Sequence, residues 1–289
     1  MKSSDYRATA PFKIDAFETH QDFGKKNKLE KELDNVSKDL AELQNKMYAH
    51  DKYAALICIQ GMDTAGKDSL IREVFKNLNA RGVVVHSFKV PTEEERSHDY
   101  LWRHYLALPE RGKFGIFNRT HYENVLVTRV HPEYILGEKL PDVNSVNDVN
   151  DDFWERRFEQ IRNFEKHLAE NGTIIFKFFL HLSKEEQRQR LLRRLRKKNK
   201  NWKFSPSDLE ERELWDDYQK CYQDAIDKTT TDKAPWYIIP ADDKPTARLI
   251  LAKILLEELS KYKDIEEPEL DAKTKENLDF YRSKLEVEG

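Results

Sequence analysis

A phosphate-binding pattern directly after an apolar run constrains this chain more than any other feature. The run YAALICIQ at 53–60 is uninterrupted, as expected for a strand that helices cover on both faces. GMDTAGK follows at 61–67 with the spacing G-x-x-x-x-G-K, and a helical pattern begins at Lys67 and ends near Gly82. This order predicts a phosphate-binding loop (P-loop) whose backbone N–H groups and helix N-terminus attract anions.

Four further apolar runs have the length of buried strands. They lie at 83–90, 115–118, 173–182 and 235–241. Helical patterns separate the runs, at 67–80, 94–107, 121–130, 151–171, 183–198, 206–231 and 245–262. Strands that alternate with helices of this length predict an α/β fold in which helices flank a parallel sheet.

We expect three regions in the chain. Residues 1–50 form an arm and a long helix, 51–263 form the main domain, and 264–289 form a polar tail. The helix at 26–50 carries one apolar stripe with spacings of three and four, made of Leu29, Leu33, Val36, Leu40, Leu43 and Met47. The stripe packs on the flank of the domain, which we favour, or it forms an oligomer contact.

Composition excludes several classes of protein. The chain has 50 Lys and Arg against 53 Asp and Glu, so its net charge of −3 indicates neither a nucleic-acid nor a membrane partner. The two cysteines, Cys58 and Cys221, have no metal-ligand spacing, and Cys58 lies within an apolar run. We expect a soluble cytoplasmic protein without a secretory signal or membrane span.

The P-loop departs from its usual form in a way that concerns metal binding. The residue after Lys67 is usually Ser or Thr, whose hydroxyl coordinates Mg²⁺, but here it is Asp68, followed by Ser69. Asn118 ends the third apolar run at a position where Asp often binds Mg²⁺. We therefore hypothesise that Asp63 in the loop supplies the metal-binding carboxylate. Asp68 either takes part in function or is an acidic helix N-terminal residue favoured by the dipole.

One segment concentrates positive charge without any acidic residue. Its basic residues between 188 and 203 are Arg188, Arg190, Arg193, Arg194, Arg196, Lys197, Lys198, Lys200 and Lys203. A solvated helix face usually mixes charges of both signs, so this run indicates a polyanion, either nucleic acid or a chain of phosphates. In a P-loop kinase such side chains would close over the transferred phosphoryl group.

Four blocks together resemble the polyphosphate kinase 2 family. They are GMDTAGKDS (61–69), FNRTHYENVL (117–126), KNWKFSPSDLEERELWDDYQKCYQDAI (200–226) and APWYIIPADDKPTARLIL (234–251). The resemblance runs from about Asp51 to Tyr262 and implies a thymidylate-kinase-like P-loop fold with a helical basic lid at about 183–231. It implies metal-dependent, reversible phosphoryl transfer from inorganic polyphosphate to AMP or ADP, with Mg²⁺ or Mn²⁺. The form N-R-T-H-Y-E at 118–123 resembles the class III branch, which uses both acceptors.

The resemblance also implies roles for individual residues. Asp63 would bind metal and orient the acceptor phosphate, Lys67 would bridge donor and transferred phosphates, and Arg119 would hold the phosphoryl group. Glu123 would position the acceptor phosphate or a second metal ion. The remaining nucleotide- or phosphate-binding candidates are Gly61, Met62, Thr64, Ala65, Gly66, Asp68, Ser69, Asn118, Arg129, Arg193, Arg194 and Lys203.

Three other functions compete with this interpretation. An ATP-dependent nucleoside monophosphate kinase of the same fold would need an adenine pocket on the donor side. A nucleic-acid-binding P-loop protein would need aromatic residues between the basic ones, and only Trp202 and Phe204 qualify. A non-catalytic scaffold would not need Asp63, Lys67 and Arg119. We expect no nucleic-acid or membrane partner and a homo-oligomer, while adenine and guanine acceptors both remain open.

Overall fold

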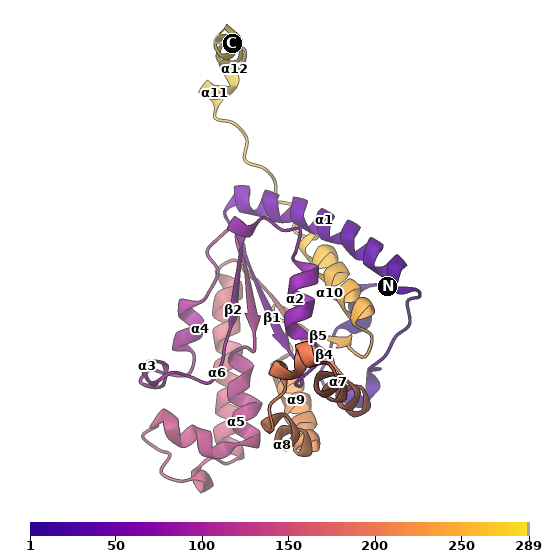
Figure 1. Ribbon diagram of the computed structural model, residues 1–289. Helices are drawn as coiled ribbons and strands as arrows, with labels where there is room; N and C mark the ends of the chain where they lie inside the picture. The colour runs from indigo at the N-terminus through magenta and orange to yellow at the C-terminus, as the bar shows by residue number, and fades with distance from the viewer. Residues whose placement is uncertain (288–289) are drawn as a thin grey trace.

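Five parallel strands form one sheet in the order β2-β3-β1-β4-β5 (Figure 1). The computed structural model describes residues 1–287. The strands are β1 (Ala54–Gln60), β2 (Val83–Ser87), β3 (Phe114–Asn118), β4 (Thr173–His181) and β5 (Trp236–Pro240). The central strand β1 is buried along its whole length, with Ile57 opposite Ile116 of β3 and Phe176 of β4. The parallel α/β fold predicted from the apolar runs is confirmed.

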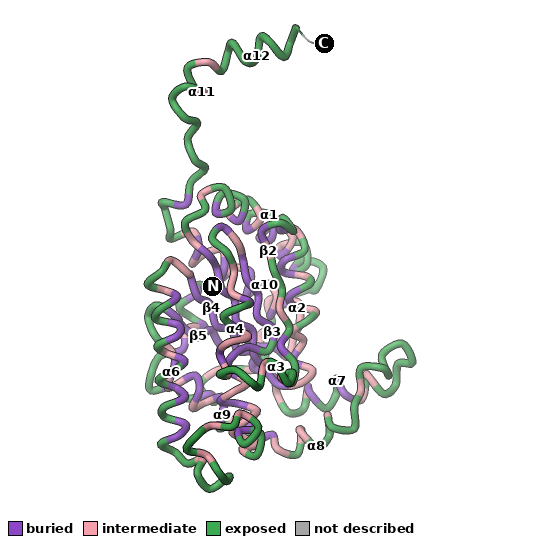
Figure 2. Tube along the Cα trace, turned by 90° about the vertical axis from the view of Figure 1, so that its left-hand side faces the viewer, coloured by how far each residue is buried: buried purple, intermediate pink, exposed green. Residues whose placement is uncertain are grey.

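Helices cover both faces of the sheet. On one face lie α1 (Lys26–His50), α2 (Lys67–Val74) and α10 (Lys244–Leu259), and their apolar side chains pack with alternate residues of β1 and β4. On the other face lie α4 (Trp102–Leu106), α6 (Asp151–Glu170) and α9 (Trp215–Thr229). Figure 2 shows the buried strands enclosed between these two layers. Burial on both faces explains the continuous apolar runs of β1, β3, β4 and β5, whereas the edge strand β2 is partly exposed although its run is also apolar.

The predicted helices are partly divided in the structure. Residues 94–107 form α3 (Glu93–Arg96) and α4, because the Asp99 side chain accepts a hydrogen bond from the backbone N–H of Leu101 and makes a turn between them. Residues 206–231 form α8 (Ser207–Glu213) and α9, while the predicted helix at 183–198 is α7 (Lys184–Arg196). The segment 121–130 is a 3₁₀ helix, η4 (His121–Val125), followed by α5 (Val127–Val130).

The helix after the P-loop is shorter than predicted. It ends at Val74 and not near Gly82. Asn77 donates a hydrogen bond to Asp34 of α1, and the side chain of Asn79 accepts one from the N–H of Arg81. These side-chain bonds compete with continued helix formation and produce a separate 3₁₀ turn at Ala80–Gly82.

The apolar stripe of α1 packs on this chain's own domain, mainly against α10, which agrees with the interpretation that we favoured. Leu29, Leu33, Leu40 and Met47 are buried there. The preceding arm is also fixed, since the N–H of Ala8 donates to the carbonyl of Trp236 in β5 at 2.8 Å.

The C-terminal tail forms α11 (Ala272–Glu276) and α12 (Leu278–Val287), which project away from the body of the domain (Figures 1 and 2). Apolar side chains of α12, including Phe280 and Leu285, are exposed. Within residues 1–287, no helix has both the length and the apolar character needed to cross a bilayer.

The packing of α1 makes a direct prediction about stability. Leu40 is 0% exposed, so Leu40→Ala should lower the free energy of unfolding by about 3 kcal/mol, because it removes buried methyl groups and leaves a cavity. Urea denaturation measures this loss. The control is Leu285→Ala in α12, where the side chain is 70% exposed and the expected change is within about 0.5 kcal/mol. Equal losses in the two variants would contradict the assignment of α1 to the core.

Candidate active site

The P-loop connects β1 to α2 and depends on two glycines. Gly61 has φ +155°, and a side chain there would meet Leu180 of β4 at 3.0 Å. Gly66 has φ +106°, a left-handed conformation that favours glycine, and it is the N-terminal cap of α2. No side chain fills the cap position, so the first N–H groups of α2 face the loop and are available to a phosphate.

Lys67 lies over the loop that it follows. Its Nζ donates a hydrogen bond to the carbonyl of Gly61 at 2.6 Å. Burial lowers the pKa of Lys67, while the neighbouring carboxylate of Asp63 acts in the opposite direction. Lys67 is half-buried, lines the cavity and has no carboxylate of the described residues within ion-pair distance, so its ammonium group is suited to bind an incoming phosphate.

Asp63 and Arg119 face each other across the cavity, with Arg119 Nη2 at 3.4 Å from Asp63 Oδ1. Both side chains are partly exposed, so they are accessible to a ligand. Arg119 follows the last residue of β3 and has φ +57°, a conformation that costs energy for a residue with a side chain and that surrounding contacts must maintain. The structure thus brings together the three residues expected to be catalytic.

The two departures from the usual P-loop form are in contact with each other. The Asn118 side-chain amide donates to Asp68 Oδ1 at 2.9 Å and to Ser87 Oγ at 3.1 Å. Ser69 Oγ donates to the Gly66 carbonyl at 3.0 Å, so this hydroxyl closes the loop. Asp68 is therefore bound by an amide, whereas Asp63 has only the longer contact with Arg119.

Glu123 lies on η4, close to the residues described above. Burial raises the pKa of Glu123, while the charges of Lys67 and Arg119 act to lower it, so these three groups share one electrostatic environment. Tyr222 of α9 lies in the same environment, because the charge of Glu123 adds to the effect of burial in raising the pKa of Tyr222. No sequence pattern singled out Tyr222, since its place beside Glu123 arises only from the packing of α9.

Positive charge surrounds a cavity of about 420 Å³ at this edge of the sheet. Its cationic lining consists of Lys67, Arg72, Arg119, Arg190, Arg193, Arg194, Lys200, Lys203 and Lys244. Among residues 1–287, Asp63 and Asp68 alone contribute negative charge to the lining. The basic run predicted as a lid thus lies beside the P-loop, and Figure 2 shows α7 extending outward from the domain at this place.

Several of these cations have no acidic partner. Within residues 1–287, no carboxylate lies within ion-pair distance of Lys67, Arg193, Lys200, Lys203 or Lys244. By contrast, Arg194 pairs with Asp208 of α8 at 3.1 Å, which joins the two helices of the lid. Unpaired cations around one cavity repel each other, and a bound polyanion removes that repulsion.

Arg190 differs from the other basic residues of α7 because it is buried, with 4% exposure. Its guanidinium donates to the carbonyls of Thr64 and Ala65 in the P-loop at 3.0 and 2.9 Å. It also donates to the carbonyls of Ala241 and Asp242 after β5, at 2.7 and 2.9 Å. Arg190 therefore holds the P-loop against the lid and the sheet.

The predicted site residues divide into three groups. Ten line the cavity, namely Asp63, Thr64, Gly66, Lys67, Asp68, Ser69, Arg119, Arg193, Arg194 and Lys203. Five others, Gly61, Met62, Ala65, Asn118 and Glu123, are in the same loops but do not line it. Arg129 does not line it either, because it pairs with Asp224 of α9 at 2.9 Å and lies over the ring of Phe158. Arg72 and Lys244 line it although the sequence did not single them out.

The donor set fits a metal ion that a substrate helps to bind. Among residues 1–287, no three His, Cys, Asp or Glu side chains are grouped so that they alone could hold a metal ion. Mg²⁺ is usually bound through one or two carboxylates together with substrate phosphates and water. Asp63 and Asp68 at the edge of a phosphate-binding cavity meet this requirement.

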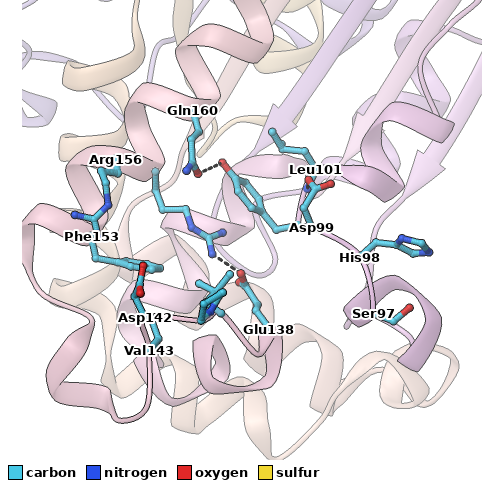
Figure 3. Close-up of a pocket in the computed structure, with 14 residues that line it drawn as sticks. Ser97, His98, Asp99, Leu101, Glu138, Asp142, Val143, Phe153, Arg156 and Gln160 are labelled. Atoms are coloured by element: carbon cyan, nitrogen blue, oxygen red, sulfur yellow. Dashed lines mark hydrogen bonds and ion pairs between the residues drawn. The ribbon is translucent and has the colours of Figure 1, made fainter.

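A second cavity, of about 610 Å³, lies between α6 and the segments 97–101 and 138–143 (Figure 3). Its lining mixes acidic and basic side chains, among them Asp99, Glu138 and Arg156. Arg157 is buried there, paired with Glu138 and stacked 3.9 Å from the ring centre of Tyr100. This lining lacks the excess of positive charge found at the P-loop, so we assign phosphate binding to the smaller cavity.

A P-loop at the end of a central parallel strand, an Arg at the end of the neighbouring strand and a basic helical lid define a kinase of the P-loop class. The comparison with known proteins makes the assignment specific. Residues 24–268 match the family described as polyphosphate kinase 2. The chain belongs to this family and is an enzyme, so the resemblance found in the sequence is confirmed.

Individual relatives agree with the family assignment. The chain is 49% identical to an ADP-polyphosphate phosphotransferase of Rhodopseudomonas palustris, over 78% of this chain and 76% of that protein. It is 46% identical to an AMP/ADP-polyphosphate phosphotransferase of Meiothermus ruber, over 78% of both chains. The crystal structure of polyphosphate kinase 2 from Arthrobacter aurescens superposes with a TM-score of 0.87 at 34% identity and covers 97% of each chain.

The position of Lys244 leads to two predictions, one for the free energy of unfolding and one for the binding of polyphosphate. Burial, followed by the positive charges of Arg190, Arg248, Arg193 and Lys200, lowers the pKa of Lys244 to about 8. The charged form is therefore disfavoured by folding, and this destabilisation disappears as the pH rises from about 8 toward the pKa of the unfolded chain. Lys244→Met should raise the free energy of unfolding by about 1 kcal/mol near pH 7, discounted for partial exposure, and by less near pH 10.

The same substitution should weaken binding of polyphosphate severalfold near pH 7, because it removes one cation from the cavity lining. Urea denaturation at the two pH values and calorimetric titration with polyphosphate measure the two effects. Lys166→Met is the control, since Lys166 is exposed on α6 and should change neither quantity. A Lys244→Met variant that loses stability near pH 7 would contradict the electrostatic environment described here.

Proposed function

We propose that this enzyme transfers phosphoryl groups from inorganic polyphosphate to AMP and ADP, reversibly and with Mg²⁺ or Mn²⁺. The observation that carries the proposal is the lining of the phosphate cavity, in which nine cationic side chains and no aromatic or large apolar side chain are found within the described part of the chain. A phosphate chain has no base to recognise, so positive charge alone is sufficient to bind it. A nucleotide donor would require an apolar surface for its base.

The relatives support both acceptors. The protein of Rhodopseudomonas palustris is an ADP-polyphosphate phosphotransferase, and that of Meiothermus ruber is an AMP/ADP-polyphosphate phosphotransferase. A protein of Pseudomonas syringae, 34% identical over 72% of this chain, is a polyphosphate:AMP phosphotransferase. The chain is most similar to the first two among these three, which favours ADP as an acceptor together with AMP.

Phosphoryl transfer needs alignment of the reacting oxygens and neutralisation of charge, and the site offers groups for both tasks. Lys67 contacts the donor and transferred phosphates, and Arg119 holds the phosphoryl group as it moves. Asp63 and Asp68 would hold a metal ion together with the substrate phosphates, and Glu123 would orient the acceptor phosphate or hold a second ion. When bound, Mg²⁺ or Mn²⁺ neutralises charge on the phosphate oxygens and aligns them. The lid cations Arg193, Arg194 and Lys203 bind the remaining phosphates of the chain.

Two further features support the setting in which we place the enzyme. Cys58 and Cys221 are free and buried, which fits the reducing environment of the cytoplasm. Exposed apolar side chains on α12 and on the edge strand β2, such as Leu285 and Val85, fit association of copies into a homo-oligomer. The concentration of unpaired cations inside one cavity, rather than along a surface stripe, favours a free phosphate chain over nucleic acid.

The function is tested by supplying the purified protein with long-chain polyphosphate, Mg²⁺ and either AMP or ADP. Chromatography should detect ADP and ATP formed from AMP, and ATP formed from ADP. Asp63→Asn should lower kcat by about 100-fold or more. A neutral amide is a poorer metal ligand than a carboxylate, and it does not neutralise the positive charge of Arg119. Polyphosphate binding should be retained in this variant.

Two controls make the outcome decisive. Asp264→Asn changes an exposed carboxylate that accepts a hydrogen bond from Tyr53, away from the site, and should leave activity unchanged. ATP with AMP but no polyphosphate tests the competing nucleotide kinase. Product formed from ATP as donor but none from polyphosphate would refute the proposed donor.

A further inference from the structure

A buried ion pair lies behind the candidate site and takes no part in the functions assigned so far. Lys177 Nζ of β4 lies 2.7 Å from Glu165 Oε2 of α6, and the two side chains are 0% and 2% exposed. Removing two charges from water carries a penalty that the attraction between them often does not recover, and apolar replacements of such pairs are frequently as stable. Stability alone therefore does not account for this pair.

Every polar atom at the ends of the two side chains has a partner. Besides Glu165, Lys177 Nζ donates to the hydroxyl of Tyr122 at 2.9 Å and to the carbonyl of Thr229 at 2.8 Å. Glu165 Oε1 accepts from the Tyr122 hydroxyl at 2.7 Å and lies 3.2 Å from His121 Nε2. The cluster thus joins β4, α6, the end of α9 and η4 at one point.

The cluster holds the segment 119–123. This segment contains Arg119 and Glu123, which we assign to the phosphoryl group and to the acceptor phosphate. Tyr122 and His121 lie directly between Arg119 and Glu123 in the chain and are fully buried, whereas Arg119 and Glu123 are not. Arg119 has φ +57°, so its backbone conformation is maintained by its neighbours rather than by its own preference. The hydroxyl of Thr120 also accepts from the N–H of Tyr122 at 3.1 Å and holds the start of η4.

We propose that Tyr122, held by the Lys177–Glu165 pair, is a positioning residue that sets the place of Arg119 and Glu123 relative to the acceptor phosphate. The inference rests on the proposed function, because it assigns Glu123 and Arg119 to the acceptor and to the phosphoryl group. Arg119 also lines the donor cavity, whereas Glu123 does not, and the other cations of that cavity belong to α2, the lid and α10. Loss of the cluster should therefore affect the acceptor more strongly than the donor.

The first test removes one hydroxyl group. In Tyr122→Phe, the ring and its packing remain, but Lys177 loses its hydrogen bond to η4 and Glu165 keeps only its contact with His121 there. The KM for ADP and its calorimetric Kd should rise by about tenfold, while the KM for polyphosphate should stay within about twofold, because Arg119 is the one cation of the donor cavity that lies in the segment held by the cluster, within the described residues. Tyr6→Phe is the matched control, since Tyr6 is also buried and donates to Gln21 at 2.7 Å, away from the site.

A second variant separates positioning from folding. Lys177→Met combined with Glu165→Leu replaces the pair by apolar side chains of similar size and should keep the melting temperature near that of the parent protein. A raised KM for ADP in a variant that remains stably folded supports positioning. Normal KM values for both substrates in this variant and in Tyr122→Phe would overturn it, as would an equal rise in both KM values.

The parent protein distinguishes a failure of this inference from a failure of the proposed function. If the parent forms no product from polyphosphate, the proposed donor is wrong, and calorimetric binding of ADP to the variants still tests whether the cluster positions an acceptor site. If the parent is active and ADP binds equally well to Tyr122→Phe, the positioning role alone is refuted.

Discussion

The bonds made by Arg190 are the constraint on which the rest of the site depends. One buried guanidinium donates to carbonyls of the P-loop and to carbonyls of the segment between β5 and α10. These bonds fix the backbone of the P-loop against the segment that follows β5. Because Arg190 belongs to α7, the base of the lid is bound to the loop that it covers. This bond network keeps the basic residues of α7 beside the P-loop.

That concentration of charge is unfavourable in the absence of ligand. The whole chain has a net charge of −3, yet nine cations and two carboxylates line one cavity. The lowered pKa of Lys244, caused by burial and by neighbouring cations, is one expression of this repulsion. A protein tolerates such a site when binding of a polyanion removes the repulsion, which is the usual relation between stability and function at a preorganised site. The absence of aromatic side chains from the cavity lining, within the described residues, restricts the polyanion further to one without a base.

All five predicted strands are present, and for β1, β3, β4 and β5 the reason is that burial on both faces leaves a continuous apolar run. The edge strand β2 was found from its apolar, β-branched residues, although two of its valines are exposed. The sequence also predicted that 61–69, 118–119 and the run 188–203 meet, because parallel strands end at one edge. What it could not predict depends on tertiary contacts. Nothing in a run of nine basic residues distinguishes Arg190, the one of them that is buried, from the others that face the cavity or solvent. Arg129 was expected at the phosphate chain, but it pairs with Asp224, which the fold brings beside it.

The contact between Asn118 and Asp68 explains why this P-loop carries two carboxylates. With Asp at 118, as in many P-loop enzymes, two negative charges would lie at hydrogen-bond distance and repel each other. With Asn at 118, the amide donates to Asp68, which lies at the start of α2, where the helix dipole favours negative charge. Asn at the strand end and Asp in the loop are thus compatible with each other, and the negative charge lies in the loop, at the same edge of the cavity as Asp63. Two carboxylates are within the number through which Mg²⁺ is usually bound together with substrate phosphates.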